Sequence, residues 1–330
     1  MRVVIGGEEI SWRATMAAEA SVENVRLPIR LGTIGLGRMT LRLSVDKTHF
    51  LNAPGGTTPP RETGPHGHLV RSSPDAEDMG RVGYVSGVIR YVPQTYRRHY
   101  IDLSIDWECY QQQFSGKSRQ SLRRKVRKFA KASGDQLDWR IYSTPEEIRR
   151  FLDLARQVAR VSYQERLLDA ALPDDPPFQA RAVWLAEQDA VRGYLLFLEG
   201  KPVAYLYCPV QDGILLYRYL GYSPEAAPLS PGTVLQWLAL ESIFQEGRFK
   251  AFDFCEGDGP HKAYFGTHHQ VCGDIYWLKP WPKPLCALAL QVSSRAASSA
   301  IAAALDRLGL KARLKKALRM RAADQSGARA

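Results

Sequence analysis

Alternating polar and apolar residues characterise the first part of the chain. The stretches 3–5 and 38–45 alternate with a period of two, which predicts strands. Strand-like runs recur at 82–91 and 100–103. Residues 52–79 are rich in Pro, Gly, Thr and Ser, and they predict a long loop. The first part is therefore expected to be rich in strands and poor in helix.

Helical spacing begins in the stretch 115–134. Leu122, Val126 and Phe129 would share one face, while the stretch holds eight basic residues and no acidic one. This pattern predicts an amphipathic helix with a strongly positive face. A second helix is predicted over 143–160, because Ser143 or Thr144 can cap it and Glu147 stands in the capping-box position.

Strand patterns return after residue 191. Runs at 194–198, 203–210 and 214–220 are divided by turn signals and predict an antiparallel meander. A helix of about fourteen residues is expected from Pro231, with Gly247 at its end.

The last third of the chain continues with a strand at 249–255, a short helix and a strand near 274–278. Residues 293–321 are helical by composition, with seven basic and no acidic residues from Arg307 to Arg321. We therefore expect a basic, leucine-bearing helical segment near the C-terminus.

Charge and cysteine usage narrow the class of protein. The 330 residues carry a formal net charge of +11, which favours anionic partners such as phosphates, nucleic acid or acidic lipids. Five scattered cysteines without CxxC spacing argue against a disulfide framework and fit a reducing cytosol. The longest apolar run near the C-terminus, 285–292, is far shorter than a bilayer requires, so we expect no membrane span. The N-terminal stretch MRVVIGGEEISW carries acid where a signal peptide would carry its apolar run, so we expect no export.

One local motif indicates an anion site. LSPGTVLQWL, residues 229–238, combines a Ser-Pro-Gly turn with a helix start directly after a strand pair. The unpaired amides and the dipole of such a start suit a phosphate or pyrophosphate. A plain capped helix is the alternative interpretation.

Two stretches carry a family resemblance. YSPEAAPLSPGTVLQW (222–237) and FDFCEGDGPHKAYFG (252–266) resemble the hallmark stretches of the BioF2-like (CelD-like) acetyltransferases, a GNAT group related to the Fem-type ligases. The resemblance covers about 115–266. It implies an α/β (α+β) GNAT-like fold, with a mixed, mostly antiparallel sheet flanked by helices. It also implies acyl-CoA as cosubstrate, with its pyrophosphate on Ser230, Gly232 and Thr233. The chain lacks the usual Q/R-x-x-G-x-G/A form of that loop.

Amine attack on a thioester needs a group that accepts a proton. The candidates cluster after the strand that ends near 253: Asp253, Glu256, Asp258 and His261. Asp253 could instead be satisfied by backbone amides, and Glu256 and Asp258 could belong to a solvated loop.

The resemblance assigns two further residues. It implies that Lys262 serves the donor phosphates or the developing oxyanion, and that Tyr264 protonates the departing thiolate. For Tyr264, packing of a half-buried aromatic ring is the alternative. His268, His269, Cys272 and Cys255 meet no standard ligand spacing, so we expect no metal site.

The expected organisation is a degenerate GNAT-like half at 1–114, a catalytic domain at 115–280 and a basic tail at 281–330. The expected function is N-acyl transfer from acyl-CoA to an amine, such as a sphingoid base or a saccharide amine. We expect a cytoplasmic protein whose segment 305–321 contacts an anionic inner leaflet, and no nucleic-acid partner. The alternatives are a non-catalytic nucleic-acid- or membrane-binding protein and a Fem-like ligase that uses aminoacyl-tRNA.

Overall fold

The chain forms two compact units. The computed structural model describes residues 3–5, 8–10, 21–32, 34–52, 58–60, 63–162 and 172–307. The first unit contains 1–95 and 273–330, and the second contains 96–272. The chain crosses between them within β8 (Thr95–Asp102) and β15 (His268–Leu278).

The first unit is built on strands. Its elements are β1 (Val3–Ile5), β2 (Glu8–Ile10), β3 (Ser21–Leu31), β4 (Ile34–Asp46), β5 (Gly67–Ser73), 3-10 helix η2 (Pro74–Glu77), β6 (Val82–Val85), β7 (Val88–Tyr91) and α8 (Pro282–Arg307). The strand order is β3-β4-β5-β15, with β7 on β15 and β6 on β7. Its core contains Leu41, Leu43, Leu69 and Tyr276.

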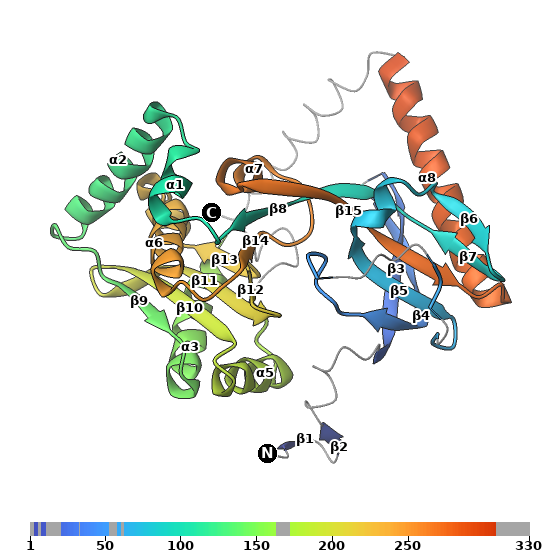
Figure 1. Ribbon diagram of the computed structural model, residues 1–330, viewed down its shortest axis with the longest axis horizontal. Helices are drawn as coiled ribbons and strands as arrows, with labels where there is room; N and C mark the ends of the chain where they lie inside the picture. The colour runs from blue at the N-terminus through green and yellow to red at the C-terminus, as the bar shows by residue number, and fades with distance from the viewer. Residues whose placement is uncertain are drawn as a thin grey trace, which may run out of the picture. The chain divides into compact units, whose positions relative to one another are not determined.

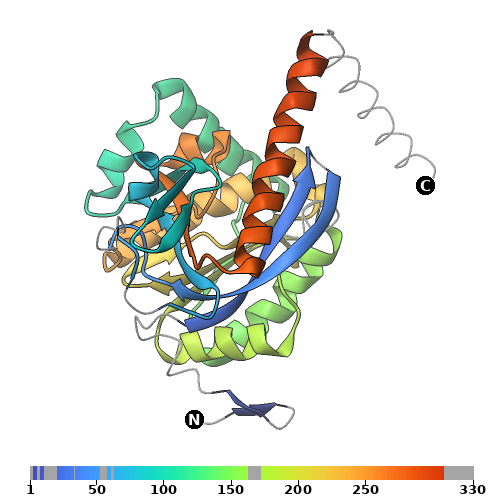
Figure 2. The same cartoon turned by 90° about the vertical axis from the view of Figure 1, so that its right-hand side faces the viewer.

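Helix α8 packs on this sheet and leaves much of its apolar surface exposed. Figure 2 shows α8 lying along β3 and β4, and the Gln291 amide donates to the carbonyl of Pro28 at 2.7 Å. By length and composition, Pro282–Ala304 is apolar enough to cross a membrane, with a mean hydropathy of 1.2 and 17% of that window buried. The expectation drawn from 285–292 rested on that short stretch alone, whereas the apolar window extends over Pro282–Ala304.

The second unit combines a twisted sheet with helices on both faces (Figure 1). Besides its parts of β8 and β15, its elements are α1 (Trp107–Gln112), α2 (Gly116–Ala132), β9 (Trp139–Tyr142), α3 (Pro145–Val161), α5 (Pro176–Glu187), β10 (Val191–Leu198), β11 (Lys201–Gln211), β12 (Ile214–Leu216), β13 (Tyr219–Tyr222), 3-10 helix η3 (Pro224–Leu229), α6 (Pro231–Glu246), β14 (Ala251–Asp253) and α7 (Pro260–Phe265). The order is β8-β14-β12-β11-β10-β9, and β13 also pairs with β11. Only β12 and β14 are parallel among these pairs.

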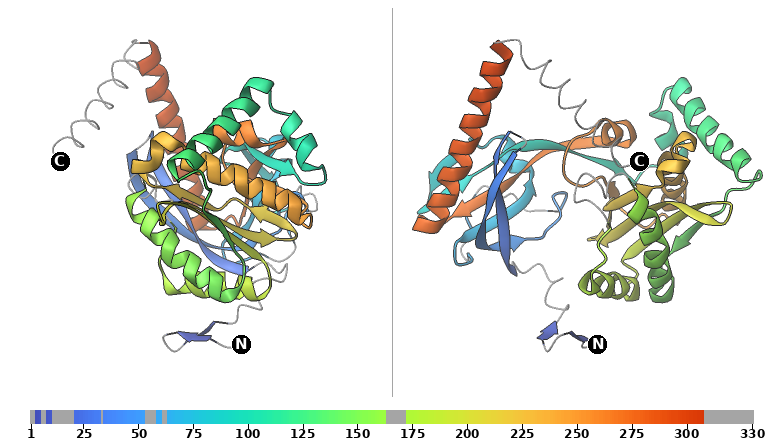
Figure 3. Two further views of the ribbon diagram at one scale, coloured as in Figure 1. Left: turned by 90° about the vertical axis from the view of Figure 1, so that its left-hand side faces the viewer. Right: turned by 180° about the vertical axis from the view of Figure 1, so that it is seen from behind.

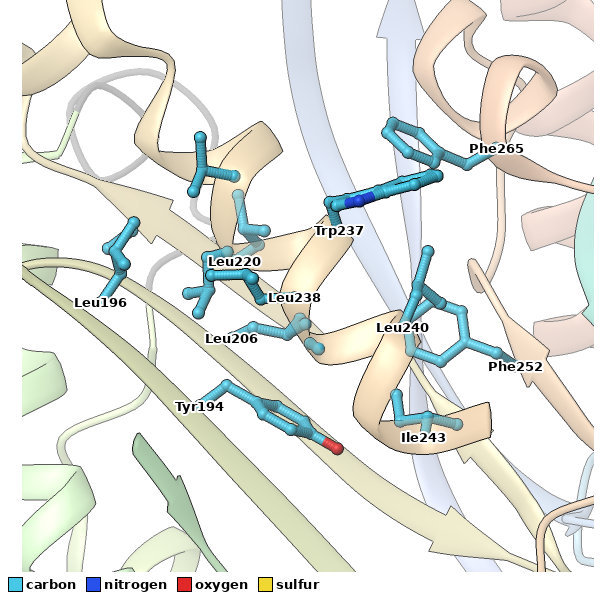
Figure 4. Packing of buried hydrophobic residues seen from close by; sticks show 14 of the residues in the cluster. Tyr194, Leu196, Leu206, Leu220, Trp237, Leu238, Leu240, Ile243, Phe252 and Phe265 are labelled. Carbon is cyan, nitrogen blue, oxygen red and sulfur yellow. The ribbon is translucent and has the colours of Figure 1, made fainter. Parts of the chain in front are cut away.

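The two-residue period of the central strands builds two cores. Tyr194 and Leu196 of β10 join a cluster with α2 and α6, whereas Leu195 and Phe197 join a cluster with α3 and α5. Figure 3 shows α2 beside α6 on one face and α3 on the other. In the first cluster, Trp237 of α6 lies near Phe265 (Figure 4). The mixed sheet with flanking helices confirms the predicted fold class.

Local signals predicted the helices of this unit well. The stretch 115–134 forms α2 and buries Leu122 and Phe129. Helix α3 begins with the predicted capping box, in which Thr144 and Glu147 each satisfy a backbone amide of the other.

The two compact units divide the chain at other positions than the expected domains. Tyr110 and Phe114, expected in the first half, lie in the α6 core of the second unit. Tyr276 and Ala287, expected in the catalytic domain and the tail, lie in the core of the first unit. The expected loop at 52–79 also ends earlier, because β5 and η2 occupy 67–77. The tandem GNAT origin of the first half stays a prediction.

A buried ion pair joins β8 to the end of β14. Arg98 Nε lies 3.2 and 3.1 Å from the two carboxylate oxygens of Asp253, and Nη2 also donates to Oδ2. The Asp253 side chain is fully buried. Burial opposes the charge on Arg98, but the hydrogen bonds and the charge of Asp253 outweigh burial and raise the pKa of Arg98.

This pair predicts a large stability effect. Asp253→Asn removes the buried negative charge that the Arg98 guanidinium binds through both carboxylate oxygens, so the free energy of unfolding should fall by about 3–5 kcal/mol. Urea-induced unfolding followed by fluorescence measures the change. Asp258→Asn is the matched control, because Asp258 is half exposed and its pair with His99 is screened by solvent, so its loss should change the free energy of unfolding much less. Equal effects of the two substitutions would contradict this account of the ion pair.

Candidate active site

The sheet of the second unit opens where β14 ends. Strands β12 and β14 pair in parallel up to Leu216 and Asp253, and the Tyr217 amide then donates to the Asp253 carbonyl at 2.8 Å. Beyond this point β13 continues on β11, whereas the chain after Asp253 leaves the sheet as the loop 254–259. The two strands therefore separate at one defined position.

The separation leaves β13 with an edge that has no strand partner in the described ranges. The Ser223 amide donates to Val203 of β11 at 2.9 Å, so alternation along the ladder turns Tyr219 and Gly221 to the same side. The backbone groups of Leu220 and Tyr222 then face the other side, where β13 has no strand partner among the described residues. Such an edge can align an extended acyl or amide chain and polarise its carbonyl.

Helix α6 begins beside this edge with unpaired amides. Ser230 adopts a left-handed conformation, with φ 55° and ψ 47°, and its side chain makes no capping hydrogen bond. The first intrahelical bond runs from the Val234 amide to Ser230, so the amides of Gly232 and Thr233 lie ahead of the helical ladder. A Cβ on Gly232 would lie 3.1 Å from the Tyr222 ring and 3.3 Å from Leu220. The turn is therefore close to β13, as an anion site next to the edge requires.

Lys262 holds the loop that follows β14. Its ammonium donates to three consecutive backbone carbonyls, those of Cys255, Glu256 and Gly257, at 3.4, 2.6 and 3.1 Å. Burial lowers the pKa of Lys262, and the negative groups around it offset part of that effect. The lysine expected at the donor phosphates thus has its three donors directed at the loop.

His261 connects α7 to α6. Its Nε2 lies 2.5 Å from Oε1 of Gln236, a glutamine buried in the otherwise apolar middle of α6. Although the residue as a whole is exposed, burial of the ring lowers the pKa of His261, and Lys262 and Lys125 lower it further. The imidazole is therefore neutral at pH 7, and with Nε2 donating to Gln236 its Nδ1 carries a lone pair.

The remaining carboxylates of the cluster differ in their surroundings. Asp258 accepts from Nε2 of His99 at 2.8 Å, and this hydrogen bond lowers the pKa of Asp258. Glu256 is exposed, and Lys262 donates to its backbone carbonyl rather than to its carboxylate. Asp253 is engaged by Arg98 and by the Cys255 amide at 3.0 Å. Of the proton acceptors predicted from sequence, His261 is the one that is uncharged and still has a free lone pair to accept a proton.

Tyr264 lies on the exposed side of α7. Its side chain is 41% exposed, and its ring contacts Phe114 and Phe265 at centroid distances of 5.2 and 5.0 Å. The ring of Tyr264 is therefore packed on one side and exposed on the other. Tyr264 belongs to the same short helix as His261 and Lys262.

The cysteine and histidines near the loop do not assemble into a metal centre. No group of three His, Cys, Asp or Glu side chains in the described ranges could hold a metal ion. His268 stacks on Tyr100, and His269 lies beside His99. Burial and Asp253 raise the pKa of Cys255 to about 12, so its thiol is protonated at neutral pH and is a poor nucleophile.

Two residues of this site were missed in the sequence. Arg98 belongs to the run YRRHYID of β8, where two arginines in a strand were the available signal. Gln236 was visible as the single amide side chain within PGTVLQWLAL. The Nε2 of Gln236 is buried and has no hydrogen-bond partner among the described residues. It can therefore still donate a hydrogen bond inside the site.

The described groups combine the elements of direct acyl transfer. A strand edge can receive an extended thioester, the amides of Gly232 and Thr233 can bind phosphate, and the neutral His261 can accept a proton. An amine acceptor can attack the thioester carbonyl itself. Direct transfer therefore needs no covalent acyl-enzyme intermediate and no enzyme nucleophile with a lowered pKa.

The chain is similar to several solved structures at low sequence identity. Comparison with the curated proteins gives no match. Among solved structures, the C-terminal domain of a putative lysylphosphatidylglycerol synthetase from Agrobacterium fabrum is 12% identical, with a TM-score of 0.45 and coverage of 67% of this chain and 71% of that chain.

Two further solved structures are similar at comparably low sequence identity. L-PGS from Bacillus licheniformis is 16% identical, covers 68% of this chain and 71% of that chain, and has a TM-score of 0.44. The FemX structure is 13% identical, covers 64% and 67%, and has a TM-score of 0.40. These likenesses are too distant to carry a conclusion about activity. Residues 116–263, which include α2, the opened β13 edge, the α6 start and His261, match the family model described as "Acetyltransferase (GNAT) domain".

Proposed function

We propose that the second unit is an N-acyltransferase that moves an acyl group from acyl-CoA to an amine. The observation that carries the proposal is the edge of β13, which has no strand partner in the part of the chain that the structure describes, beside the amides that precede the helical ladder at the start of α6. The acetyltransferase match over 116–263 supports the same reaction class.

In the proposed complex, the CoA pyrophosphate binds the amides of Gly232 and Thr233 near Ser230. The pantetheine arm follows β13, and a backbone amide of Leu220 or Tyr222 polarises the thioester carbonyl. The small size of Gly232 supports this placement, because a larger residue would meet Tyr222.

The proposed chemistry is direct transfer. The neutral amine nitrogen forms a bond to the carbonyl carbon, the C–S bond breaks, and the amine proton passes to His261. The thiolate takes a proton from Tyr264. His261 is preferred over Asp253 and Glu256 as the base, because its pKa is lowered and Asp253 is held by Arg98. Lys262 acts as a positioning residue for the loop 255–257.

The acceptor is proposed to be a lipid or saccharide amine at a membrane surface. Exposed apolar side chains of α8, Leu285, Leu290, Val292 and Ile301, support a peripheral membrane position. The basic segment 305–321 was expected to contribute, but almost all of it lies outside the described residues.

CoA binding provides the first test. CoA at about one hundred times its dissociation constant should raise the melting temperature by on the order of 5 °C. Gly232→Val should abolish the shift, because the added side chain meets Tyr222 and Leu220. Gly35→Val is the matched control, since no atom lies within 4 Å of a Cβ there. A wild-type protein that ignores CoA and acyl-CoA but gains stability from aminoacyl-tRNA would favour the Fem-like alternative and overturn the donor assignment.

The pH dependence of turnover tests the base. With an acyl-CoA and an accepted amine, kcat/KM should fall as pH decreases through a pKa below the ordinary histidine value of 6.5, because protonated His261 cannot accept a proton. His261→Gln should lower kcat by about 10²–10⁴ and remove this acidic limb. An unchanged acidic limb in His261→Gln would assign the base to another group.

Membrane contact is tested by sedimentation with anionic liposomes. The full chain should cosediment, and deletion of 305–330 should reduce the bound fraction because the basic residues no longer meet the acidic headgroups. Leu290→Glu with Ile301→Glu should reduce it further, since both side chains are exposed on α8. Equal sedimentation of all three proteins would contradict the peripheral position.

A further inference from the structure

A cavity between α2 and α6 is not used by the proposed transfer reaction. Its volume of about 670 Å³ lies in the range of small-molecule sites. The residues of α6 that line it, Trp237, Leu238 and Glu241, lie beyond the first turn, where the CoA pyrophosphate is proposed to bind. The cavity is therefore separate along α6 from the amides of Gly232 and Thr233.

One wall of this cavity carries three arginines of α2. Arg119, Arg123 and Arg127 are spaced four residues apart, so their Cα atoms rise by about 6 Å from one to the next. No ion pair to any of them occurs within the described part of the chain. Like charges at this spacing destabilise a helix, and an anion between them would relieve that repulsion.

The other wall is apolar. Val126, Trp237 and Leu238 line the cavity, and Trp237 and Leu238 are each 7% exposed. Glu241 supplies one negative charge against the three arginines, so the lining remains cationic. A ligand that satisfies both walls combines an anionic group with an apolar body. Arginine guanidinium groups match the oxygens of a phosphate with paired hydrogen bonds.

We propose that the groove between α2 and α6 binds a phosphate ester that carries an apolar chain. The phosphate lies on Arg119, Arg123 and Arg127, and the chain lies on Val126, Trp237 and Leu238. This binding does not require the transfer reaction, and it gives the basic helix α2 a role that the donor site leaves unexplained.

Isothermal titration calorimetry on the full chain tests the proposal, with monomeric dioctanoyl phosphatidic acid as the probe. Dioctanoylglycerol lacks the phosphate, inorganic phosphate lacks the chain, and both should bind at least about tenfold more weakly. The variant Arg119→Gln/Arg123→Gln/Arg127→Gln should lose at least about tenfold in affinity. The matched control is Lys117→Gln/Arg124→Gln/Lys131→Gln, which removes the same charge from exposed positions of α2 outside the groove and should keep the affinity.

The outcomes separate this site from general charge and from the donor site. Equal losses in the two triple variants, absence of binding by the wild type, or displacement of the probe by CoA or by a single-stranded oligonucleotide would each overturn the proposal. Val126→Phe fills the groove without changing its charge and should weaken probe binding by at least about tenfold. Cosedimentation with phosphatidic acid vesicles would identify a bilayer lipid as the source, whereas binding of the monomeric probe alone would identify a soluble phosphate ester.

Discussion

The ion pair between Arg98 and Asp253 determines where the sheet of the second unit opens. Asp253 is the last residue of β14, and its carboxylate is buried and fixed by the guanidinium from β8. Its carbonyl accepts from Tyr217 and its carboxylate from the Cys255 amide, so the departing chain is fixed at its first residues. Because an isolated buried charge is costly, this corner tolerates few other arrangements.

The loop and α7 depend on that corner. Lys262 binds the carbonyls of 255–257, which turns the chain back toward α6 and places His261 against Gln236. Among the described residues the outer edge of β13 has no strand partner. One short segment thus contains residues that stabilise the fold, Asp253 and Lys262, and the candidate base His261. Substitutions at Asp253 or Lys262 would affect the site by changing the conformation of this segment.

Local signals in the sequence predicted much of this fold. The capping box of α3, the amphipathic spacing of α2 and the Ser-Pro start of α6 each involve residues within a few positions, so their chemistry is readable from the chain alone. The division into units was not readable in this way, because β15 and α8 return to strands formed some two hundred residues earlier. Leu278, for example, pairs with Gly67.

The sequence predicted a cluster of candidate side chains but not the contacts that hold them. The cluster 253–264 was recognised from its charges and its resemblance, but the partner that holds Asp253 lies 155 residues away in sequence. The donors of Lys262 are directed at backbone carbonyls, which no pattern of side chains reveals. Gln236 also became meaningful only once its contact with His261 was seen.

The central claim is that the β13 edge and the α6 start together form the donor site. Hydrogen exchange measured by mass spectrometry with and without CoA tests it directly, because bound ligand slows exchange at the amides it covers. We predict slower exchange in peptides that contain 220–222 and 232–233, with little change in α3 or α5. Unchanged exchange in those two peptides at saturating CoA would contradict the account.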